Sequence, residues 1–228
     1  MAPAFTLYTD AGNPNGFKTT LIFEELKAAY PSSELDYEIR TLDTSEGVEE
    51  HKSEWYKKIN SVGRLPLIVH HRSDGTDFTV WETAAILYYL VQRFDWDYRV
   101  SFPSQSEFES DSLQWMFFSH AGVAPMQGQA FWFFNNPHEK IPTAITRYLG
   151  EVKRVYNILD TRLNGRDYFV GAGKGAYSIA DVNVYPWVRV HEASGLKDID
   201  AYPNLKRWAE RISTRPAVLA TEKLLESN

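Results

Sequence analysis

The chain of 228 residues contains no cysteine. Disulfide bonds, thiolate metal sites and a nucleophilic thiol belonging to the protein are therefore excluded. If this protein takes part in sulfur chemistry, the reacting sulfur atoms must come from bound molecules.

Clusters of basic residues and long apolar runs are also missing. No five basic residues follow one another, and the formal net charge is −6 with a pI near 5.5. Nucleic-acid binding is not expected, because it depends on clustered Lys and Arg. No run of 18 apolar residues occurs, and the start MAPAFTLYTD lacks the features of a secretion signal. We therefore expect a cytoplasmic protein that does not contact membranes.

Aromatic residues, in contrast, are abundant, with 13 Phe, 13 Tyr and 7 Trp. A chain of this length buries roughly 70% of its unfolded surface, which is enough for one large core or two smaller ones. Most of the aromatic rings are expected in such cores, and some are expected to line a pocket for apolar compounds.

The first third of the chain alternates between strand and helix patterns. Residues 5–8 alternate like a strand, residues 12–16 are dense in turn formers, and apolar residues then recur at helical spacing from 21 to 29. A second strand is predicted at 37–42 and a polar helix at 48–59. Strand, helix and strand in this order require a right-handed crossover between parallel strands.

A hairpin and a helix start follow. Leu67-Ile68-Val69 and Phe78-Thr79-Val80-Trp81 flank the turn residues Ser73-Asp74-Gly75, and a helix is predicted to begin at residues 82–86. Pro66 is either the first residue of its strand or a cis proline, and in both cases the peptide groups of Leu65 are left free. An extended peptide can pair with such groups, and the unpaired N–H groups of the helix start attract a carboxylate.

Residues 94–106 break the pattern, and every long stretch beyond them has helical periodicity. We predict an α/β domain at 1–93, a linker at 94–106 and an all-helical domain at 107–228. Ser178-Ile179-Ala180-Asp181 has the spacing of a capping box, which predicts a stabilised helix start with no part in chemistry.

Residues Arg64-Leu65-Pro66 followed by Trp81-Glu82-Thr83-Ala84-Ala85-Ile86 resemble the thioredoxin-like half of a cytosolic glutathione transferase. The family's usual versions are Val-Pro and Glu-Ser-x-Ala-Ile. Five segments, in the right order, are similar to the fungal nitrogen-regulator-like (nu-like) branch: NPNGFKTTLIFEEL (13–26), EHKSEWYKKINSVGRLP (50–66), APMQGQAFWF (124–133), YSIADVNVYPW (177–187) and YPNLKRWAERISTRPAV (202–218). The resemblance implies a thioredoxin-like glutathione-binding domain followed by an all-helical domain.

The resemblance also implies the candidate catalytic residue. An enzyme that uses glutathione as a nucleophile must stabilise the thiolate, since a free thiol near pKa 8.5 is only a few per cent ionised at pH 7. Asn15 lies where the loop after the first strand meets the first helix, and the branch carries Asn at this position. Tyr8 and Thr9 are runners-up. Taken without the family, Asn15 is an ordinary turn residue of an Asn-Gly pair.

Glutathione would then be held mostly by main chain. The resemblance implies contacts with Leu65 and Pro66, with Glu82 and Thr83 at the γ-glutamyl end, and with His51 and Arg64 at the glycyl end. The alternative for Glu82 and Thr83 is a plain helix cap, and for His51 and Arg64 a surface pair. The candidate acceptor residues are Phe17, Phe131, Trp132 and Arg147, although this chain lacks the histidine that the branch carries near Trp132.

Adjacent residues of a strand point to opposite faces, so His70 and His71 cannot chelate one metal ion together, and no metal is expected. We predict a homodimeric glutathione transferase with glutathione as co-substrate and small apolar electrophiles, peroxides or disulfides as acceptors. The alternatives are a glutathione-binding regulator or scaffold without turnover, and a glutathione-dependent disulfide reductase or peroxidase. The lack of Cys rules out those relatives that form a mixed disulfide through their own sulfur.

Overall fold

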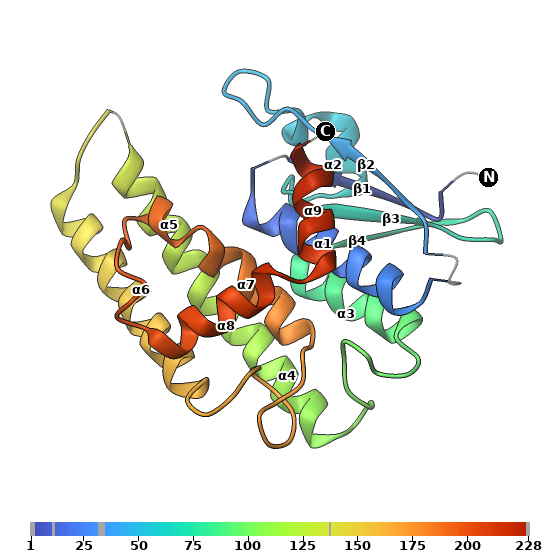
Figure 1. Ribbon diagram of the computed structural model, residues 1–228. Coiled ribbons are helices and arrows are strands. Elements are labelled where there is room, and N and C mark those ends of the chain that lie inside the picture. Colours follow the sequence, from blue (N-terminus) through green and yellow to red (C-terminus); the bar gives the residue numbers. More distant parts are fainter. Residues whose placement is uncertain (1–2, 11, 32–34, 137, 227–228) are drawn as a thin grey trace. The chain divides into compact units, whose positions relative to one another are not determined.

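The computed structural model describes residues 3–10, 12–31, 35–136 and 138–226 (Figure 1). The chain forms two compact units. The first runs through Val100 and resumes at Pro216, and the second spans Ser101–Arg215. The boundary at Val100 lies within the predicted linker 94–106. The last helix, α9 (Pro216–Glu226), differs from the prediction, because it packs on α1 (Pro14–Ala29) in the first unit instead of joining the helical unit.

The first unit is built on a four-stranded sheet in the order β2-β1-β3-β4. Its strands are β1 (Phe5–Thr9), β2 (Tyr37–Thr41), β3 (Leu67–His71) and β4 (Asp77–Trp81). β1 and β2 are parallel across α1, whereas β3 pairs antiparallel with β1 and with β4. The predicted parallel pairing of the first two strands and the hairpin are therefore confirmed, and the fold of this unit is thioredoxin-like.

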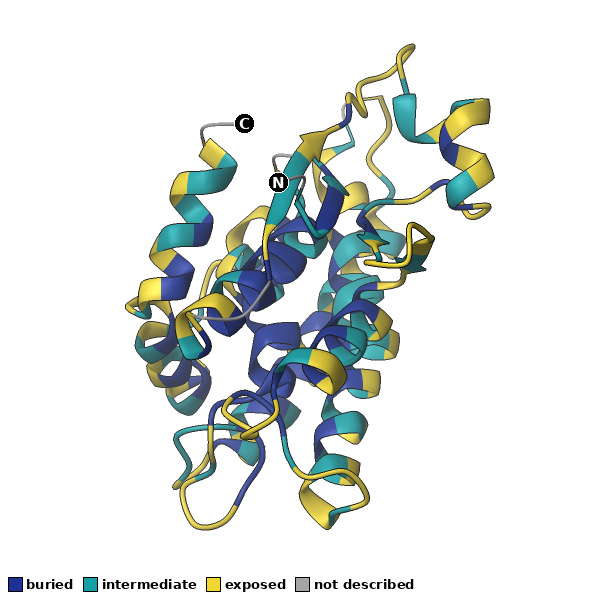
Figure 2. Cartoon of the chain, turned by 90° about the vertical axis from the view of Figure 1, so that its right-hand side faces the viewer, coloured by how far each residue is buried: buried dark blue, intermediate teal, exposed yellow. Residues whose placement is uncertain are grey.

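Helices cover both faces of the sheet (Figure 1). On one face α2 (Glu54–Ile59) places Tyr56 against Leu67, Val69 and Leu42. On the other face the ring of Phe5 contacts the rings of Phe23 in α1 and Phe94 at the end of α3 (Thr83–Phe94). Figure 2 shows buried residues along the inner sides of the helices and on the strands, and exposed residues in the loops.

The helix predicted at 48–59 is shorter and divided. Glu50–Lys52 form a short 3₁₀ helix, η1, and α2 begins only at Glu54. Ser53 between them has an extended backbone, and its hydroxyl accepts a hydrogen bond from the N–H of Tyr56 at 3.4 Å. A serine in this position starts a new helix, since its side chain replaces the missing intrahelical acceptor.

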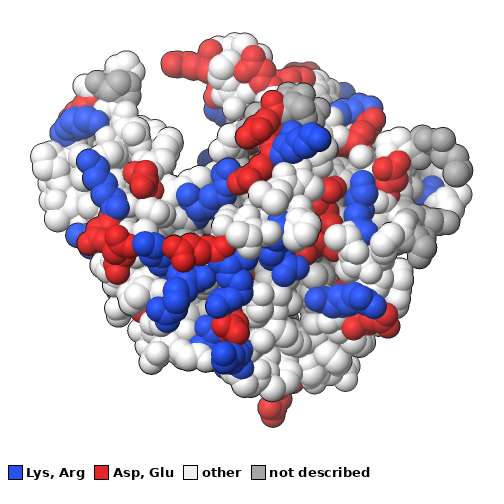
Figure 3. Space-filling model, viewed as in Figure 1, with Lys and Arg blue, Asp and Glu red and all other residues white. Residues whose placement is uncertain are grey.

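The second unit is helical. Its elements are α4 (Glu107–Phe118), the π turn η2 (Ser119–Val123), α5 (Ala124–Asn135), α6 (Pro142–Arg162), α7 (Ile179–Arg189), the 3₁₀ helix η3 (His191–Ser194) and α8 (Pro203–Ser213). Figure 3 shows acidic and basic side chains interspersed over one face of the molecule. Ion pairs of the second unit include Arg154–Glu151. None of the helices in the described ranges combines the length and the apolar character that a membrane crossing requires.

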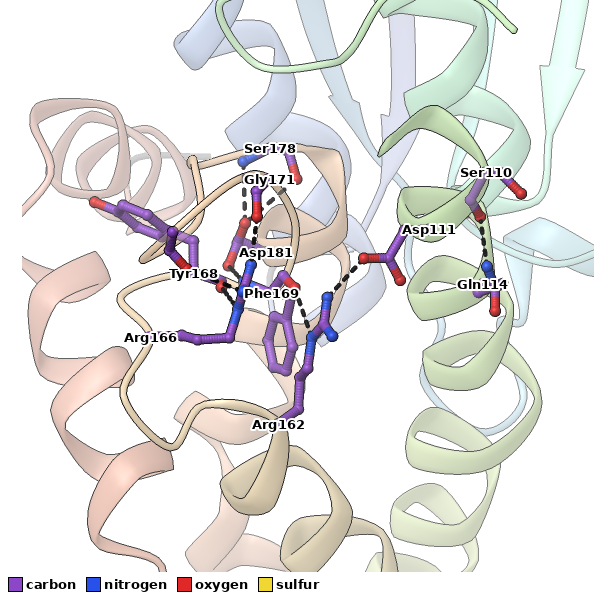
Figure 4. Close-up of polar contacts among 11 residues, drawn as sticks. Ser110, Asp111, Gln114, Arg162, Arg166, Tyr168, Phe169, Gly171, Ser178 and Asp181 are labelled. Carbon is purple, nitrogen blue, oxygen red and sulfur yellow. Dashed lines mark hydrogen bonds and ion pairs between the residues drawn. The ribbon is translucent and has the colours of Figure 1, made fainter. Parts of the chain in front are cut away.

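The capping box at the start of α7 is confirmed. The Ser178 hydroxyl accepts from the N–H of Ala180, and the Asp181 carboxylate accepts from the N–H of Ser178 at 3.0 Å. Asp181 also accepts from the N–H of Phe169 at 3.2 Å (Figure 4). It accepts from Trp208 Nε1 at 2.8 Å as well. Burial raises the pKa of Asp181 to about 6, and these hydrogen bonds act in the opposite direction.

Two arginines tie down the loop that precedes this helix start (Figure 4). Arg162 donates to the Phe169 carbonyl at 2.8 Å and pairs with Asp111 at 2.6 Å. Arg166 donates to the carbonyls of Tyr168 and Gly171. The two guanidinium groups therefore hold the loop through hydrogen bonds to its carbonyl groups. Asp181 holds the same loop by accepting from the N–H of Phe169.

Candidate functional site

Three segments of the first unit end side by side because of the strand register. Tyr8 on β1 is opposite Leu67 on β3, and Leu67 is opposite Trp81 on β4. The loop after β1, the residues before β3 and the residues after β4 therefore meet at one edge of the sheet. These are the segments that contain Asn15, Leu65 and Thr83.

The start of α1 places Asn15 at this edge. Asn13 is the cap residue, and its side chain accepts from the N–H of Asn15 at 2.9 Å, with Pro14 between them as the first helical residue. Asn15 is half-buried in the first turn, where the helix dipole favours negative charge. The arrangement suits an amide that must face an anion.

Gly16 lets this helix start lie close to the end of β1. A Cβ atom at Gly16 would be 2.1 Å from Thr9 Oγ1, so no larger residue fits without rearrangement. Thr9 is fully buried, and its hydroxyl donates to the Asp10 carbonyl. Tyr8 is half-buried, with its ring near those of Trp55 and Tyr56.

The residues before β3 combine a fixed carbonyl at Arg64 with main-chain groups at Leu65 that have no partner in the described ranges. The Arg64 carbonyl accepts from the Tyr56 hydroxyl and from Asn60 Nδ2, both at 2.8 Å, which holds the backbone in place. The Leu65–Pro66 peptide is cis, as one of the two alternatives for Pro66 anticipated. Within the described ranges, neither peptide group of Leu65 has a hydrogen-bond partner. The side chain of Arg64 is exposed.

The start of α3 is also open. Glu82, the cap residue, has a positive φ of 70°, and no side chain caps the helix. The first main-chain bond of the helix joins the Ile86 N–H to the Glu82 carbonyl. Because the N–H groups before it have no intrahelical acceptor, they are available to an anion. Thr83 is the first helical residue and is buried, whereas Glu82 is exposed.

A buried lysine lies directly behind Thr83. Lys18 on α1 is fully buried, and its Nζ is 3.3 Å from Thr83 Oγ1. Burial lowers the pKa of Lys18 to about 7, and the charge of Glu82 partly opposes this shift. Sequence reasoning did not single out this residue, although a lone Lys within the otherwise uncharged run GFKTTLIF was a signal.

Two further polar atoms near the loop after β1 have no hydrogen-bond partner in the described part of the chain. They are Asp10 Oδ1 and His51 Nδ1, and both are buried. Burial raises the pKa of Asp10, while its hydrogen bond with Asn13 and the charge of His51 lower it. Buried polar groups in native proteins are nearly always satisfied, so these two atoms suit a bound polar molecule.

The candidate acceptor residues are distributed over both units. Phe17 is only 5% exposed, within the core of the first unit. In the second unit Phe131 and Trp132 on α5 are 49% and 55% exposed, and Arg147 on α6 is exposed. The Trp132 ring packs edge-on against Phe133.

His70 and His71 point to different neighbours. His70 Nδ1 is 2.8 Å from the Tyr89 hydroxyl, whereas His71 contacts Asp77 and Thr6. In the described ranges, no three or more His, Cys, Asp or Glu side chains are grouped so that they could hold a metal ion.

Two family models match the chain. Residues 3–92 match the glutathione S-transferase N-terminal domain, and residues 123–216 match the glutathione S-transferase C-terminal domain. The chain belongs to the glutathione S-transferase family. The segments around Asn15, Leu65 and Thr83 all lie within the N-terminal match, so the open edge of the sheet belongs to the domain that the family shares.

Relatives of this family member carry names that refer to different activities. Glutathione S-transferase 2 of Schizosaccharomyces pombe is 34% identical over 95% of this chain and 94% of its own length. The disulfide-bond oxidoreductase YfcG of Escherichia coli is 33% identical over 91% of this chain and 89% of its own. The transcriptional regulator URE2 of Saccharomyces cerevisiae is 27% identical over 94% of this chain and 66% of its own.

Among solved structures, the glutathione transferase URE2P6 of Phanerochaete chrysosporium, in complex with oxidised glutathione, superimposes with a TM-score of 0.87. It is 34% identical, and the match covers 99% of this chain and 98% of that one. These similarities place the chain in the Ure2-like branch of the family, as its sequence segments indicated.

Proposed function

We propose that this protein binds glutathione at the open edge of the first unit and activates its thiol for attack on small electrophiles. The meeting of the start of α1, the peptide groups of Leu65 and the uncapped start of α3 at one sheet edge is the observation that supports this most directly. Each segment suits a different part of the tripeptide, and relatives of the chain are glutathione transferases.

The cysteinyl residue of glutathione pairs with the free peptide groups of Leu65, as an added strand. The γ-glutamyl carboxylate accepts hydrogen bonds from the N–H groups at the start of α3 and from Thr83, and Glu82 binds the ammonium group. His51, whose Nδ1 has no partner within the described chain, and Arg64 interact with the glycyl end. Pro66 directs the main chain of Leu65 toward the ligand.

Asn15 stabilises the thiolate. Its side-chain amide donates a hydrogen bond to the sulfur, assisted by the positive end of the α1 dipole. Lowering the thiol pKa by two units requires about 2.7 kcal/mol of preferential stabilisation. The thiolate then forms a bond with an electrophilic carbon while the leaving group departs with the electron pair.

The electrophilic acceptor binds at aromatic residues of the second unit, and the protein acts as a dimer. Phe131, Trp132 and Arg147 are exposed in the second unit, where they suit an apolar acceptor. Phe17, in contrast, acts through the packing of α1. The protein works as a cytoplasmic homodimer in detoxification, with glutathione as co-substrate and without a metal.

Asn15→Ala tests the assignment of the thiolate donor. We expect at least a tenfold lower rate of glutathione transfer to an aryl halide, about 1.4 kcal/mol in the transition state, with affinity for S-methylglutathione changed less than threefold. Asn164→Ala, at an exposed position of the second unit, is the control. Unaltered turnover in Asn15→Ala contradicts the role given to this residue.

Two alternatives have relatives that favour them. A regulator that binds glutathione without turnover is favoured by the similarity to URE2, and a disulfide reductase by the similarity to YfcG. Since the chain has no Cys, a reductase would exchange sulfur only between substrate and glutathione. Assays with an aryl halide, a peroxide and a small disulfide separate the three, because a regulator binds immobilised glutathione but turns over none of these substrates.

A further inference from the structure

The surroundings of Lys18 are unusual for a buried amine. An ammonium group has three N–H donors, yet the side chain has a single hydrogen bond in the described part of the chain, to Thr83 Oγ1. Glu82, the residue before α3, is the charged group that acts on the pKa of Lys18. The helix α9, which packs on α1, carries Glu222, Lys223 and Glu226, and none of these three is among the causes of the shift. A buried charge with so few partners is costly. In the free protein the neutral form of this amine is therefore favoured.

The Thr83 hydroxyl has one proton to donate and two possible acceptors. When Lys18 is neutral, its lone pair can accept this proton. When a carboxylate binds at the start of α3, the hydroxyl donates to the carboxylate instead, and its oxygen must then accept from Lys18. The ammonium form supplies a stronger donor and an attractive charge behind the bound anion.

We propose that Lys18 takes up a proton when the α-carboxylate of a γ-glutamyl peptide binds at the start of α3, and that the Thr83 hydroxyl couples the two events. Lys18 is thus a positioning residue, which acts on the ligand through Thr83. The inference rests on the proposed function, since it assigns that end of the ligand to this helix start.

The coupling makes recognition depend on pH and on the ligand's charge. A pKa of about 7 for Lys18 in the free protein leaves much of the amine neutral just above neutral pH. An arriving anion raises that pKa, so affinity declines as the pH rises through this range. A ligand with a neutral carboxamide in place of the α-carboxylate takes up no proton.

Isothermal titration calorimetry with S-methylglutathione at pH 7.5 measures the proton. The thioether has no thiol that could release one. Titrations in phosphate and in Tris, which differ in ionisation enthalpy, should show an uptake of roughly 0.5 to 0.8 proton per site, as expected for an amine of this pKa. The S-methyl peptide with an α-carboxamide should show an uptake below about 0.2.

Variants assign the proton to a residue. Lys18→Met should abolish the uptake and weaken binding about tenfold, and Lys18→Arg, which is always charged, should bind without uptake. Thr83→Val should abolish the uptake with Lys18 intact, while Thr83→Ser retains it. Lys27→Met, on an exposed part of the same helix, should behave as the unaltered protein.

The outcomes distinguish the two proposals. If S-methylglutathione binds without proton uptake, or if Lys18→Met and Thr83→Val both retain the uptake, the role of Lys18 is refuted while the glutathione site stands. If S-methylglutathione does not bind the unaltered protein at millimolar concentration, the proposed function fails, and this inference fails with it. Circular dichroism of each variant establishes that it is folded.

Discussion

Two helix starts in this molecule have opposite designs. At the start of α7 the buried carboxylate of Asp181 accepts from the main chain of Ser178 and Phe169, from the Ser178 hydroxyl and from the Trp208 indole. At the start of α3 no side chain caps the helix, and the buried Lys18 behind it has one hydrogen bond within the described chain. Both charged groups are buried, but only Asp181 is surrounded by partners.

The difference separates a structural role from a functional one. A buried charge whose hydrogen bonds are all made inside the protein gains no further partner from a ligand. Those hydrogen bonds also fix the positions of the groups around it. An incompletely satisfied one gains partners when a ligand of the right charge arrives, and the helix start beside it remains open to that ligand. The two sites can be altered independently because they belong to different compact units.

The largest effect is expected from Asp181→Ala. Removing the carboxylate leaves buried donors of Ser178, Phe169 and Trp208 without an acceptor, which should cost about 3 kcal/mol or more. Chemical denaturation at pH 7 measures this. Ser178→Ala should cost about 1 kcal/mol, and Glu210→Ala, exposed on α8, less than about 0.5 kcal/mol. If Asp181→Ala lowers the free energy of unfolding no more than the control does, the partners of Asp181 do not stabilise the fold, and the proposed difference from Lys18 is wrong.

A smaller effect is expected from Gly16→Ala, at a third helix start. The added Cβ would lie 2.1 Å from Thr9 Oγ1, and overpacking of this kind costs about 2 kcal/mol. To relieve this contact the start of α1 must move, and Asn15 moves with it. Both the stability and the transfer activity should therefore decrease. Combining the change with Thr9→Ala should restore part of both. Gly150→Ala, where nothing lies within 4 Å of the new atom, should be neutral or slightly stabilising, and an equal loss there would show that the close packing at Gly16 is unimportant.

The smallest effect is a pH dependence of stability caused by Lys18. Its folded pKa of about 7 is lower than the usual value of 10.5, so folding disfavours the ammonium form. Stability should therefore rise between pH 7 and pH 8 relative to Lys18→Met, by about 1 kcal/mol. Denaturation of both proteins at four pH values measures the difference. A difference that does not vary with pH means that Lys18 is not neutral in the folded protein.

Local sequence patterns predicted those parts of the fold that depend on near neighbours. The hairpin follows from turn residues around Gly75, which has a positive φ of 81°. The capping box follows from a hydroxyl and a carboxylate three residues apart. The extent of the helix predicted at 48–59 was wrong because periodicity alone did not reveal that Ser53 begins a new helix.

The sequence by itself determined the strand and helix order of the first unit, the cap of α7, the lack of any thiol, and the motifs that place the chain in its family. Tertiary structure alone decided that α9 packs on α1, that Leu65, Asn15 and Thr83 meet at one edge, and that Lys18 is buried behind Thr83. Turns and caps involve atoms a few residues apart, so their residues specify them directly. Burial and strand register depend on which distant apolar surfaces pack together, and that choice is made by the whole chain.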